Sequence, residues 1–303
     1  MRLARVAVSE PKVAVVGHVE WVQFARVAHV PRAGEIVHAS DPFEEPAGGG
    51  AVAAVQLARL AGCSLLVTAL GEDEQGLRSA TRLGELCVDV RAATLTAPTR
   101  RAVTLVDDRR ERTITTLGGR LEPQGADERI DWSALAGSDA IYFTAGDARA
   151  LSVAREAARV LVASPRAEHA LGDGVRIDAI VLSADDEIER HELERAHEQA
   201  ELVVFTEGAH GGSYRRRDGE RGRWAPVAPP GEPVDSYGCG DSFAAGLTYG
   251  LGVGLSTDDA LALAARCGAA CLTGRGPYER QLCRADLSGD GSLEQLIKDR
   301  SPG

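Results

Sequence analysis

Short apolar strands alternate with helices through the second half of the chain, and this alternation constrains the fold more than any other feature of the sequence. Runs rich in β-branched residues indicate strands, and the longer stretches between them indicate helices. The expected strands are residues 140–144, 179–182 and 202–206, and the expected helices are residues 148–163 and 186–200. A βαβα order of this kind predicts a mainly parallel sheet with helices on both faces.

The first part of the chain adds to this sheet and also contains strands that do not fit it. The elements expected to join the sheet are strands over residues 13–17, 63–70 and 87–90, with helices over residues 51–60 and 73–86. The remaining extended segments are residues 21–30, 35–39, 99–106 and 112–117, and the last two form a predicted hairpin. We expect these segments to form a small β-rich lid, from about 18–45 and 97–120, within a single domain spanning residues 1–303.

Composition excludes several classes of function. Lys+Arg total 34 against 45 Asp+Glu, so the formal net charge of −11 disfavours nucleic acid and anionic membrane surfaces as partners. No uncharged apolar run approaches the roughly 20 residues that a membrane-spanning helix needs. The six cysteines include no Cys-x-x-Cys pair and are expected to be reduced thiols. These features predict a soluble, cytoplasmic protein that acts on small molecules.

A glycine-rich turn stands directly before an apolar helical run near the end of the chain. Gly238 and Gly240 flank Cys239, and the helix begins near Asp241. Successive glycines let backbone N–H groups turn toward one point, and the helix N-terminus adds partial positive charge, so the turn suits phosphate oxygens. The Asp241 carboxylate could take a proton from an attacking hydroxyl. Taken alone, however, such a short pattern is more often an ordinary helix start with Asp241 or Ser242 as its cap.

Two other glycine-rich segments support a ligand site. Thr206-x-Gly208-x-x-Gly211 follows a predicted strand, and ligands of open α/β sheets bind at the carboxyl ends of strands. The triplet Gly48, Gly49, Gly50 precedes a predicted helix and offers a third place for backbone amides to meet polar ligand groups. A Walker-type phosphate loop is absent from the sequence, which has only two lysines, Lys12 and Lys298.

Together these motifs resemble the ribokinase-like (PfkB-type) kinases, which phosphorylate sugars and nucleosides with ATP. The C-terminal signature of that family, Asp-Thr-x-Gly-Ala-Gly-Asp-x-Phe, is matched here by Asp235-Ser-Tyr-Gly-Cys-Gly-Asp-Ser-Phe243. The resemblance runs from Val13 to about Pro277 and includes Pro31-Arg-Ala-Gly-Glu35 and Leu70-Gly-Glu-Asp73. It implies a ribokinase-like three-layer α/β sandwich with a mostly parallel central sheet and a small β-rich lid.

The resemblance also implies roles for the residues that match. Asp241 would be the base that activates the acceptor hydroxyl, and the amides of Gly238, Cys239 and Gly240 would form an anion hole for the transferring phosphoryl group. The residues expected to line the ATP site are Ser183, Thr206, Gly208 and Gly211. The residues expected to bind the acceptor are Glu20, Gly48, Gly49, Gly50 and Asp241.

Two metal roles follow from the same resemblance. Asp186 stands where the family has the last residue of Asn-x-x-Glu, so it would position Mg²⁺ through water. Asp235 would shape its loop, which in some members coordinates a monovalent cation. ATP and Mg²⁺ are therefore the expected cofactors, with a monovalent cation as an addition. A homodimer through lid residues 21–39 and 99–118 is also expected from the family.

The acceptor half of the expected site departs from the family pattern. Val52 stands where the early helix normally carries an asparagine that contacts the substrate. The stretch after the first strand normally reads Gly-x-x-Asn-x-Asp, and here Glu20 and Val22 take the last two named positions. A valine cannot bind a sugar hydroxyl, and an unpaired polar group is costly. The acceptor is thus either unusual, with an apolar or aromatic part facing Trp21 and Val52, or not a simple sugar.

The sequence predicts an ATP-dependent phosphotransferase acting on a hydroxyl of a small molecule, with a sugar or sugar derivative as the first expectation. A nucleoside kinase is one alternative, because Trp21 would suit a base. A non-catalytic metabolite or nucleotide sensor on the same fold is the other. Val22 and Val52 favour the sensor, whereas the intact segment from Gly238 to Asp241 disfavours it. His18, which follows the first strand, is either a contact of the acceptor pocket or a hydrogen-bonded structural histidine.

Overall fold

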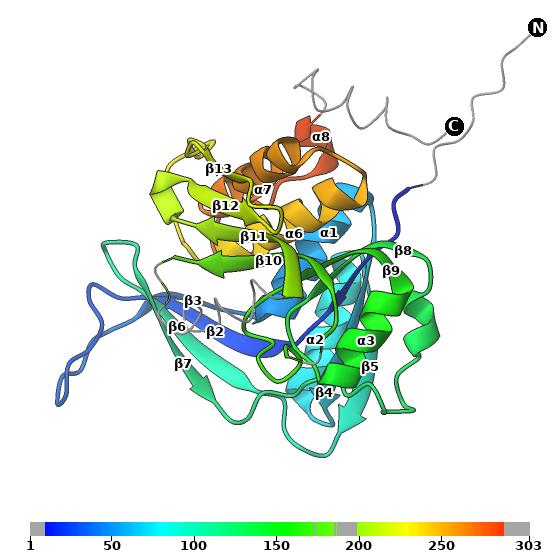
Figure 1. Ribbon diagram of the computed structural model, residues 1–303. Coiled ribbons are helices and arrows are strands. Elements are labelled where there is room, and N and C mark those ends of the chain that lie inside the picture. Colours follow the sequence, from blue (N-terminus) through cyan, green and yellow to red (C-terminus); the bar gives the residue numbers. More distant parts are fainter. Residues whose placement is uncertain (1–9, 173, 185, 187–198, 288–303) are drawn as a thin grey trace, which may run out of the picture.

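A computed structural model of the chain describes residues 10–172, 174–184, 186 and 199–287. Its main element is a nine-stranded sheet in the order β13-β12-β11-β10-β9-β8-β1-β4-β5 (Figure 1). The bounds are β1 (Val13–Val16), β4 (Ser64–Gly71), β5 (Val88–Leu95), β8 (Ser138–Phe143), β9 (Ala158–Ala163), β10 (Ile177–Ser183), β11 (Ala200–Thr206), β12 (Gly212–Arg216) and β13 (Arg221–Trp224). All pairs from β5 to β11 are parallel, and β12 and β13 are antiparallel additions at one edge.

Helices cover both faces of this sheet because alternate strand residues are apolar on both sides. Val13 and Val15 join the core beneath α1, α6 and α7, whereas Ala14 and Val16 join the core beneath α3. The helices are α1 (Gly49–Ala61), α2 (Glu74–Glu85), α3 (Ala148–Ala157), α6 (Cys239–Gly252), α7 (Thr257–Cys271) and α8 (Arg284–Leu287). The chain thus has the three-layer α/β architecture that the sequence predicts. Within the described residues, no helix combines the length and the apolar character needed to cross a membrane.

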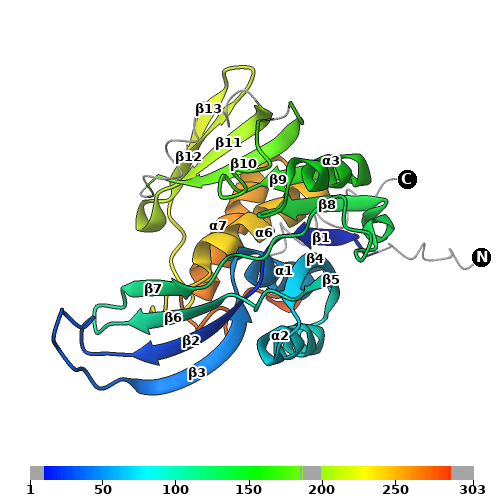
Figure 2. The same ribbon diagram turned by 90° about the horizontal axis from the view of Figure 1, so that it is seen from below.

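A second, four-stranded sheet forms the lid and projects to the left in both views (Figures 1 and 2). Its strands are β2 (Glu20–Arg26), β3 (Ser40–Ala47), β6 (Arg101–Val106) and β7 (Arg112–Leu117), in the order β3-β2-β6-β7. The β6–β7 hairpin is as predicted, and β2 pairs with β6 in parallel. The inner face of the lid packs on the body through Phe24, whose ring centroid lies 4.9 Å from that of Tyr237.

Several predicted boundaries of helices and strands are wrong, and one hairpin was not predicted. The helix expected over 148–163 ends at Ala157, and the apolar run that follows it forms β9 between β8 and β10. The lid strand expected over 35–39 begins instead at Ser40. The hairpin of β12 and β13 was not predicted, because arginines interrupt its apolar pattern. Most of the helix expected over 186–200 lies outside the described residues.

Asp73 joins the start of α2 to the segment that leads into β6. One carboxylate oxygen accepts hydrogen bonds from the Gly76 N–H (2.8 Å) and the Thr99 hydroxyl (2.7 Å), and the other accepts from the Thr99 N–H (2.7 Å). Burial alone would raise the pKa of Asp73, but these hydrogen bonds lower it overall. Asp73 therefore acts as a helix cap and also anchors one end of the lid.

We expect Asp73→Ala to lower the free energy of unfolding by about 1–2 kcal/mol, the usual cost of losing a helix cap. Because the folded state lowers the pKa of this carboxyl, its stabilisation is complete above the unfolded value near 3.8 and disappears as the pH falls through the folded value. Urea unfolding at neutral pH and near pH 3 measures both effects, with the exposed Glu74→Ala as the control. An equal loss at the two pH values would contradict this role.

Candidate active site

The predicted site residues gather where the parallel strands end at their carboxyl termini. Ser183 ends β10 and Thr206 ends β11, and the two are neighbours in the ladder. Thr144 follows β8, and its N–H donates to the Val16 carbonyl at the end of β1 (2.9 Å). This edge of an open α/β sheet is the usual place for a ligand site.

The turn before α6 has the backbone expected of an anion site. Gly238 precedes the helix in the left-handed region (φ 81°), which favours glycine, and no side chain caps the helix there. A methyl group on Gly238 would lie 2.9 Å from the Val52 side chain, whereas one on Gly240 would meet nothing within 4 Å. The Cys239 N–H donates to the Ser236 carbonyl within the turn (3.4 Å), whereas exposed Gly240 borders open space, so an anionic group of a nucleotide fits this end of the helix at Gly240.

Asp241 lies in the first turn of α6 and is only partly buried. Loss of hydration raises its pKa above the usual value of 3.8, and the negative charge of Glu20 acts in the same direction. The positive charges of His18, Arg166 and Arg112 oppose this rise without cancelling it. A carboxylate with a raised pKa is a stronger base, so this environment suits proton abstraction.

The glycine triplet at the start of α1 meets Asp241 directly. A methyl group on Gly49 would lie 3.0 Å from Asp241 Oδ1, 2.9 Å from Thr144 Oγ1 and 3.6 Å from His18 Cε1. Gly48, with φ 86°, donates its N–H to the buried Tyr237 hydroxyl (3.3 Å). Gly49 therefore lies closely against a carboxylate, a hydroxyl and an imidazole that the sequence separates widely, and a side chain at this position would collide with them.

Glu20 borders the same region but is engaged by other side chains. Its Oε1 lies 3.4 Å from His18 Nε2 and 3.3 Å from an Arg100 nitrogen. Burial alone would raise the pKa of Glu20, yet the hydrogen bond from His18 and the charges of His18, Arg100 and Arg120 lower it overall. The predicted contact of Glu20 with an acceptor stays a prediction, since this carboxylate is an ionised partner of two neighbouring side chains.

The predicted ATP residues form the carboxyl end of β10 and the turn after β11. The Thr206 hydroxyl donates to the Leu182 carbonyl (3.3 Å). Gly208 begins a short 3₁₀ turn, and the Gly211 carbonyl accepts from the Glu207 N–H (2.9 Å) before β12 starts. The turn is therefore closed by its own backbone, and its glycines keep side chains away from the sheet edge.

The two residues predicted for metals differ in their surroundings. Asp186 forms an ion pair with Arg166 (2.5 Å), a residue whose charge also acts on Asp241. Buried Asp235 accepts hydrogen bonds from the N–H groups of Tyr237 (2.8 Å) and Gly276 (3.2 Å), so it braces the anion turn. Across the described residues, no cluster of three or more His, Cys, Asp or Glu side chains could hold a metal ion.

The sequence did not identify Arg112 and Arg166 as neighbours of Asp241, and the expectation that Trp21 faces the acceptor is not supported. Arg112 at the start of β7 donates to the Ser236 hydroxyl (3.1 Å), and Arg166 follows the unpredicted strand β9. No local pattern marks Arg112, whereas the apolar run over 160–163 could have revealed β9. Trp21 does not support an aromatic acceptor pocket: its ring lies 4.3 Å from the Arg78 guanidinium of α2. Val52 is fully buried beneath Gly238, so it packs the turn.

The thiol of Cys239 supports the turn as a neutral group. A hydrogen bond with Cys271 and burial raise the pKa of Cys239. Cys271 in turn lies 3.4 Å from the Tyr237 carbonyl oxygen. The two thiols therefore pack the base of the turn against the end of α7, with Cys239 in its protonated form.

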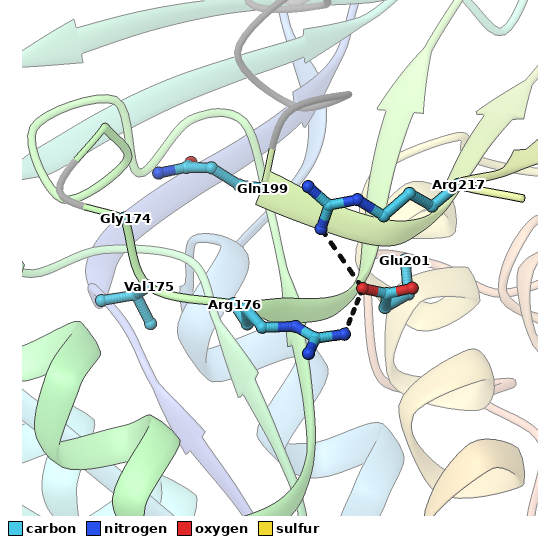
Figure 3. A pocket seen from close by; sticks show the side chains of 6 residues that line it. All are labelled: Gly174, Val175, Arg176, Gln199, Glu201 and Arg217. Carbon is cyan, nitrogen blue, oxygen red and sulfur yellow. Dashed lines mark hydrogen bonds and ion pairs between the residues drawn. The ribbon is translucent and has the colours of Figure 1, made fainter.

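Two hollows lie elsewhere on the molecule. One of about 440 Å³ lies at the opposite edge of the large sheet, where Arg176 and Arg217 both point to Glu201, at 2.5 and 3.3 Å (Figure 3). Another of about 730 Å³ lies beside α7, between residues 227–232 and 279–286. Neither is lined by Asp241 or by the glycines of the turn. Both hollows are therefore separate from the candidate site.

Comparison with known proteins identifies a family. The family model for pfkB family carbohydrate kinases matches residues 10–171 and 177–282. Acarbose 7(IV)-phosphotransferase of an Actinoplanes species is 43% identical over 76 residues, which cover 25% of each chain. Fructokinase of Escherichia coli is 44% identical over 63 residues, which cover 19% of this chain and 20% of that protein. These matches span a quarter or less of each curated relative.

Solved structures match over nearly the whole chain. Arabidopsis thaliana ribokinase, solved with ribose and ATP, has a TM-score of 0.73 at 19% identity, covering 95% of this chain and 99% of that one. A Methanocaldococcus jannaschii nucleoside kinase of the ribokinase family has a TM-score of 0.70 at 15% identity, covering 96% and 99%. These similarities establish the ribokinase fold for this chain.

We expect Arg112→Ala to raise the pKa of Asp241 further, because it removes a positive charge that favours the ionised carboxylate. Carboxyl ¹³C chemical shifts followed across pH measure this pKa, with the Asp241 signal assigned by its loss in Asp241→Asn. Arg101→Ala is the matched control, since Arg101 is exposed and its charge acts on Asp73. Equal Asp241 pKa values in the two arginine variants would show that Arg112 does not belong to the site.

Proposed function

The chain belongs to the pfkB family of carbohydrate kinases, and we propose that it transfers the γ-phosphoryl group of ATP to a hydroxyl of a sugar or sugar derivative. One observation carries this proposal. The carboxylate of Asp241, whose pKa is raised, lies in the first turn of α6 directly after an uncapped glycine turn, which suits phosphate, and it lies beside Gly49 of the triplet expected to bind the acceptor. A base between an anion site and an alcohol site is the arrangement that direct phosphoryl transfer requires.

In this mechanism Asp241 takes the proton of the acceptor hydroxyl as its oxygen attacks the γ-phosphorus. The bond from that phosphorus to the bridging oxygen breaks, and ADP leaves. The amides of Gly238, Cys239 and Gly240 stabilise the charge on the transferring group. Mg²⁺, when bound with the nucleotide, supplies charge neutralisation. Positioning and electrostatics therefore provide most of the catalysis.

The nucleotide would extend from this turn along the sheet edge. Ser183, Thr206, Gly208 and Gly211 would line it, because they end two adjacent strands and form the turn between β11 and β12. Asp186 would reach Mg²⁺ only through water, since its carboxylate is paired with Arg166. The monovalent cation near Asp235 remains a prediction from family resemblance.

The lid would limit hydrolysis of ATP by water. Arg112 of β7 contacts Ser236 directly before the turn, and Phe24 of β2 contacts Tyr237. The lid and the turn are therefore in contact, and a lid in this place keeps water from the reacting groups. Dimerisation through the lid and a cytoplasmic location also remain predictions.

A nucleoside acceptor is the second candidate, favoured by the likeness to a nucleoside kinase of the same fold. The sequence favoured a nucleoside because Trp21 would suit a base. That support fails, because the Trp21 ring packs under Arg78 on another face of the lid. A non-catalytic sensor is less well supported, since a sensor has no need for a base at the position of Asp241. We therefore keep a sugar as the first acceptor class to test.

We expect Asp241→Asn to lower kcat by roughly 10²-fold or more, the usual loss for a general base. ADP release with MgATP is measured on D-fructose, D-ribose, acarbose, adenosine and inosine. Asp259→Asn is the matched control, because Asp259 lies in the first turn of α7, where it contacts Ser256. Acceptor-dependent turnover that is equal in Asp241→Asn and wild type would contradict the role of Asp241 as the base. ADP binding without turnover on any acceptor would favour the sensor.

A further inference from the structure

The lid strand β3 has an irregular backbone at Asp41. Between two successive residue pairs of the β2–β3 ladder, β3 contributes two residues, Asp41 and Pro42, whereas β2 contributes one. This extra residue makes a β-bulge, and such bulges often redirect a side chain beside a functional site. Asp41 also has φ 51°, in the left-handed region that residues other than glycine seldom adopt and that persists where other contacts hold it. The bulge directs the Asp41 carboxylate to Arg275, in the segment after α7.

Arg275 binds Asp41 through two nitrogens of its guanidinium group. Nε donates to Oδ2 at 2.9 Å, and Nη2 donates to Oδ1 at 2.7 Å and to the Asp41 carbonyl oxygen at 3.3 Å. The guanidinium carbon also lies 3.8 Å from the centre of the Phe43 ring, on the same strand. An exposed ion pair usually contributes little, but bidentate geometry and an aromatic ring beneath the guanidinium both strengthen it. Arg275 therefore fastens β3 to the segment after α7.

An aromatic stack leads from Phe43 to the candidate site. The Phe43 ring lies flat on the Phe24 ring, with centroids 4.7 Å apart, and Phe24 in turn meets Tyr237 edge-on, with centroids 4.9 Å apart. Tyr237 is buried directly before Gly238, and its hydroxyl accepts a hydrogen bond from the Gly48 N–H (3.3 Å). Closely packed rings cannot shift independently of one another. A displacement of Phe43 would therefore be transmitted to the anion turn and to the glycine triplet.

The residue after Arg275 gives a second connection to Tyr237. The Gly276 N–H donates to Asp235 Oδ2 (3.2 Å), and Asp235 Oδ1 accepts from the Tyr237 N–H (2.8 Å). A methyl group on Gly276 would lie 2.8 Å from the Phe43 ring, so this segment and the lid are in close contact. The aromatic and the backbone connections therefore begin at Arg275 and end at the same tyrosine.

We propose that Arg275 is a positioning residue of the kinase: by holding the lid through Asp41, it fixes Tyr237 and so aligns the anion turn with the glycine triplet. This inference rests on the proposed function and adds to it a residue outside the nucleotide and acceptor residues named above. When the Asp41–Arg275 pair is broken, the lid and the segment after α7 can move apart, and Tyr237 loses its fixed place. The acceptor hydroxyl and the transferring phosphoryl group are then misaligned, which slows the chemical step.

Two substitutions break the pair from opposite sides. Asp41→Asn removes the negative charge and keeps a residue type that tolerates the left-handed region. Arg275→Gln removes the guanidinium group, and the double variant tests whether the two residues act through each other. Glu45→Gln is the matched control, because Glu45 lies on the same strand and accepts from Arg82 Nε and Nη2, both at 3.0 Å. That pair ties β3 to α2 and lies on neither connection to Tyr237.

The experiment measures kcat and KM on whichever of D-fructose, D-ribose, acarbose, adenosine and inosine gives the highest kcat/KM, and ADP binding by calorimetry. We expect Asp41→Asn and Arg275→Gln each to lower kcat by about 10- to 100-fold, the range for a small misplacement of reacting groups. The double variant should lose no more than the larger single loss, because both residues act through one contact. ADP affinity should equal that of wild type, since ADP lacks the phosphoryl group that the turn holds. Glu45→Gln should match wild type in every measurement.

Several results would overturn the inference. An unchanged kcat in Arg275→Gln shows that the ion pair does not position the site, and the kinase proposal survives that result. Losses that multiply in the double variant show that the two residues act separately, and an equal loss in Glu45→Gln shows a general effect of loosening the lid. Weaker ADP binding in Arg275→Gln shows a structural role. Absence of turnover of every acceptor by the wild-type protein, with ADP still bound, removes the kinase proposal and this inference together.

Discussion

The first turns of α1 and α6 meet at one point, and the candidate site depends on how closely their backbones approach. The Gly48 N–H donates to the Tyr237 hydroxyl (3.3 Å), which holds the glycine triplet against the loop before α6. A methyl group on Gly50 would lie 2.6 Å from the His18 carbonyl oxygen, closer than real side-chain carbons approach. Because glycine permits this contact, the start of α1 lies against the His18 backbone, and Gly49 lies beside Asp241 in the first turn of α6.

This close approach places two carboxylates in environments that shift their pKa values in opposite directions. Glu20 has a lowered pKa because His18, Arg100 and Arg120 surround it, and it serves as a fixed negative anchor. Asp241 has a raised pKa because loss of hydration outweighs the nearby positive charges. Two neighbouring carboxyl groups with separated pKa values can fill different roles, one structural and one in proton transfer. His18 contacts Glu20, with Nε2 3.4 Å from Oε1, and its charge also acts on Asp241.

The lid is coupled to the same loop through contacts spread along its inner face. Phe24 meets the Tyr237 ring, Arg112 meets Ser236, and an Arg26 nitrogen lies 3.4 Å from the Val234 carbonyl oxygen. A shift of the lid would therefore move the segment directly before the glycine turn. In the proposed kinase this segment would link closure of the lid over an acceptor to alignment of the anion site, which is how lids commonly complete a site.

The sequence by itself determined the layered α/β architecture, the lid segments and the residues of the glycine turn, because these depend on local periodicity and on glycine spacing. It did not determine the strand over 158–163, since a short apolar run after a helix can continue that helix or begin a strand. Only the tertiary structure brought Arg112, Arg166, Thr144 and Tyr237 near Asp241. It also showed that Trp21 packs against Arg78 and does not face the expected acceptor. Such neighbours come from strands distant in sequence, and their direction depends on sheet pairing. Likewise, only the tertiary structure showed that Nδ1 of His18 is buried without a hydrogen-bond partner among the described residues.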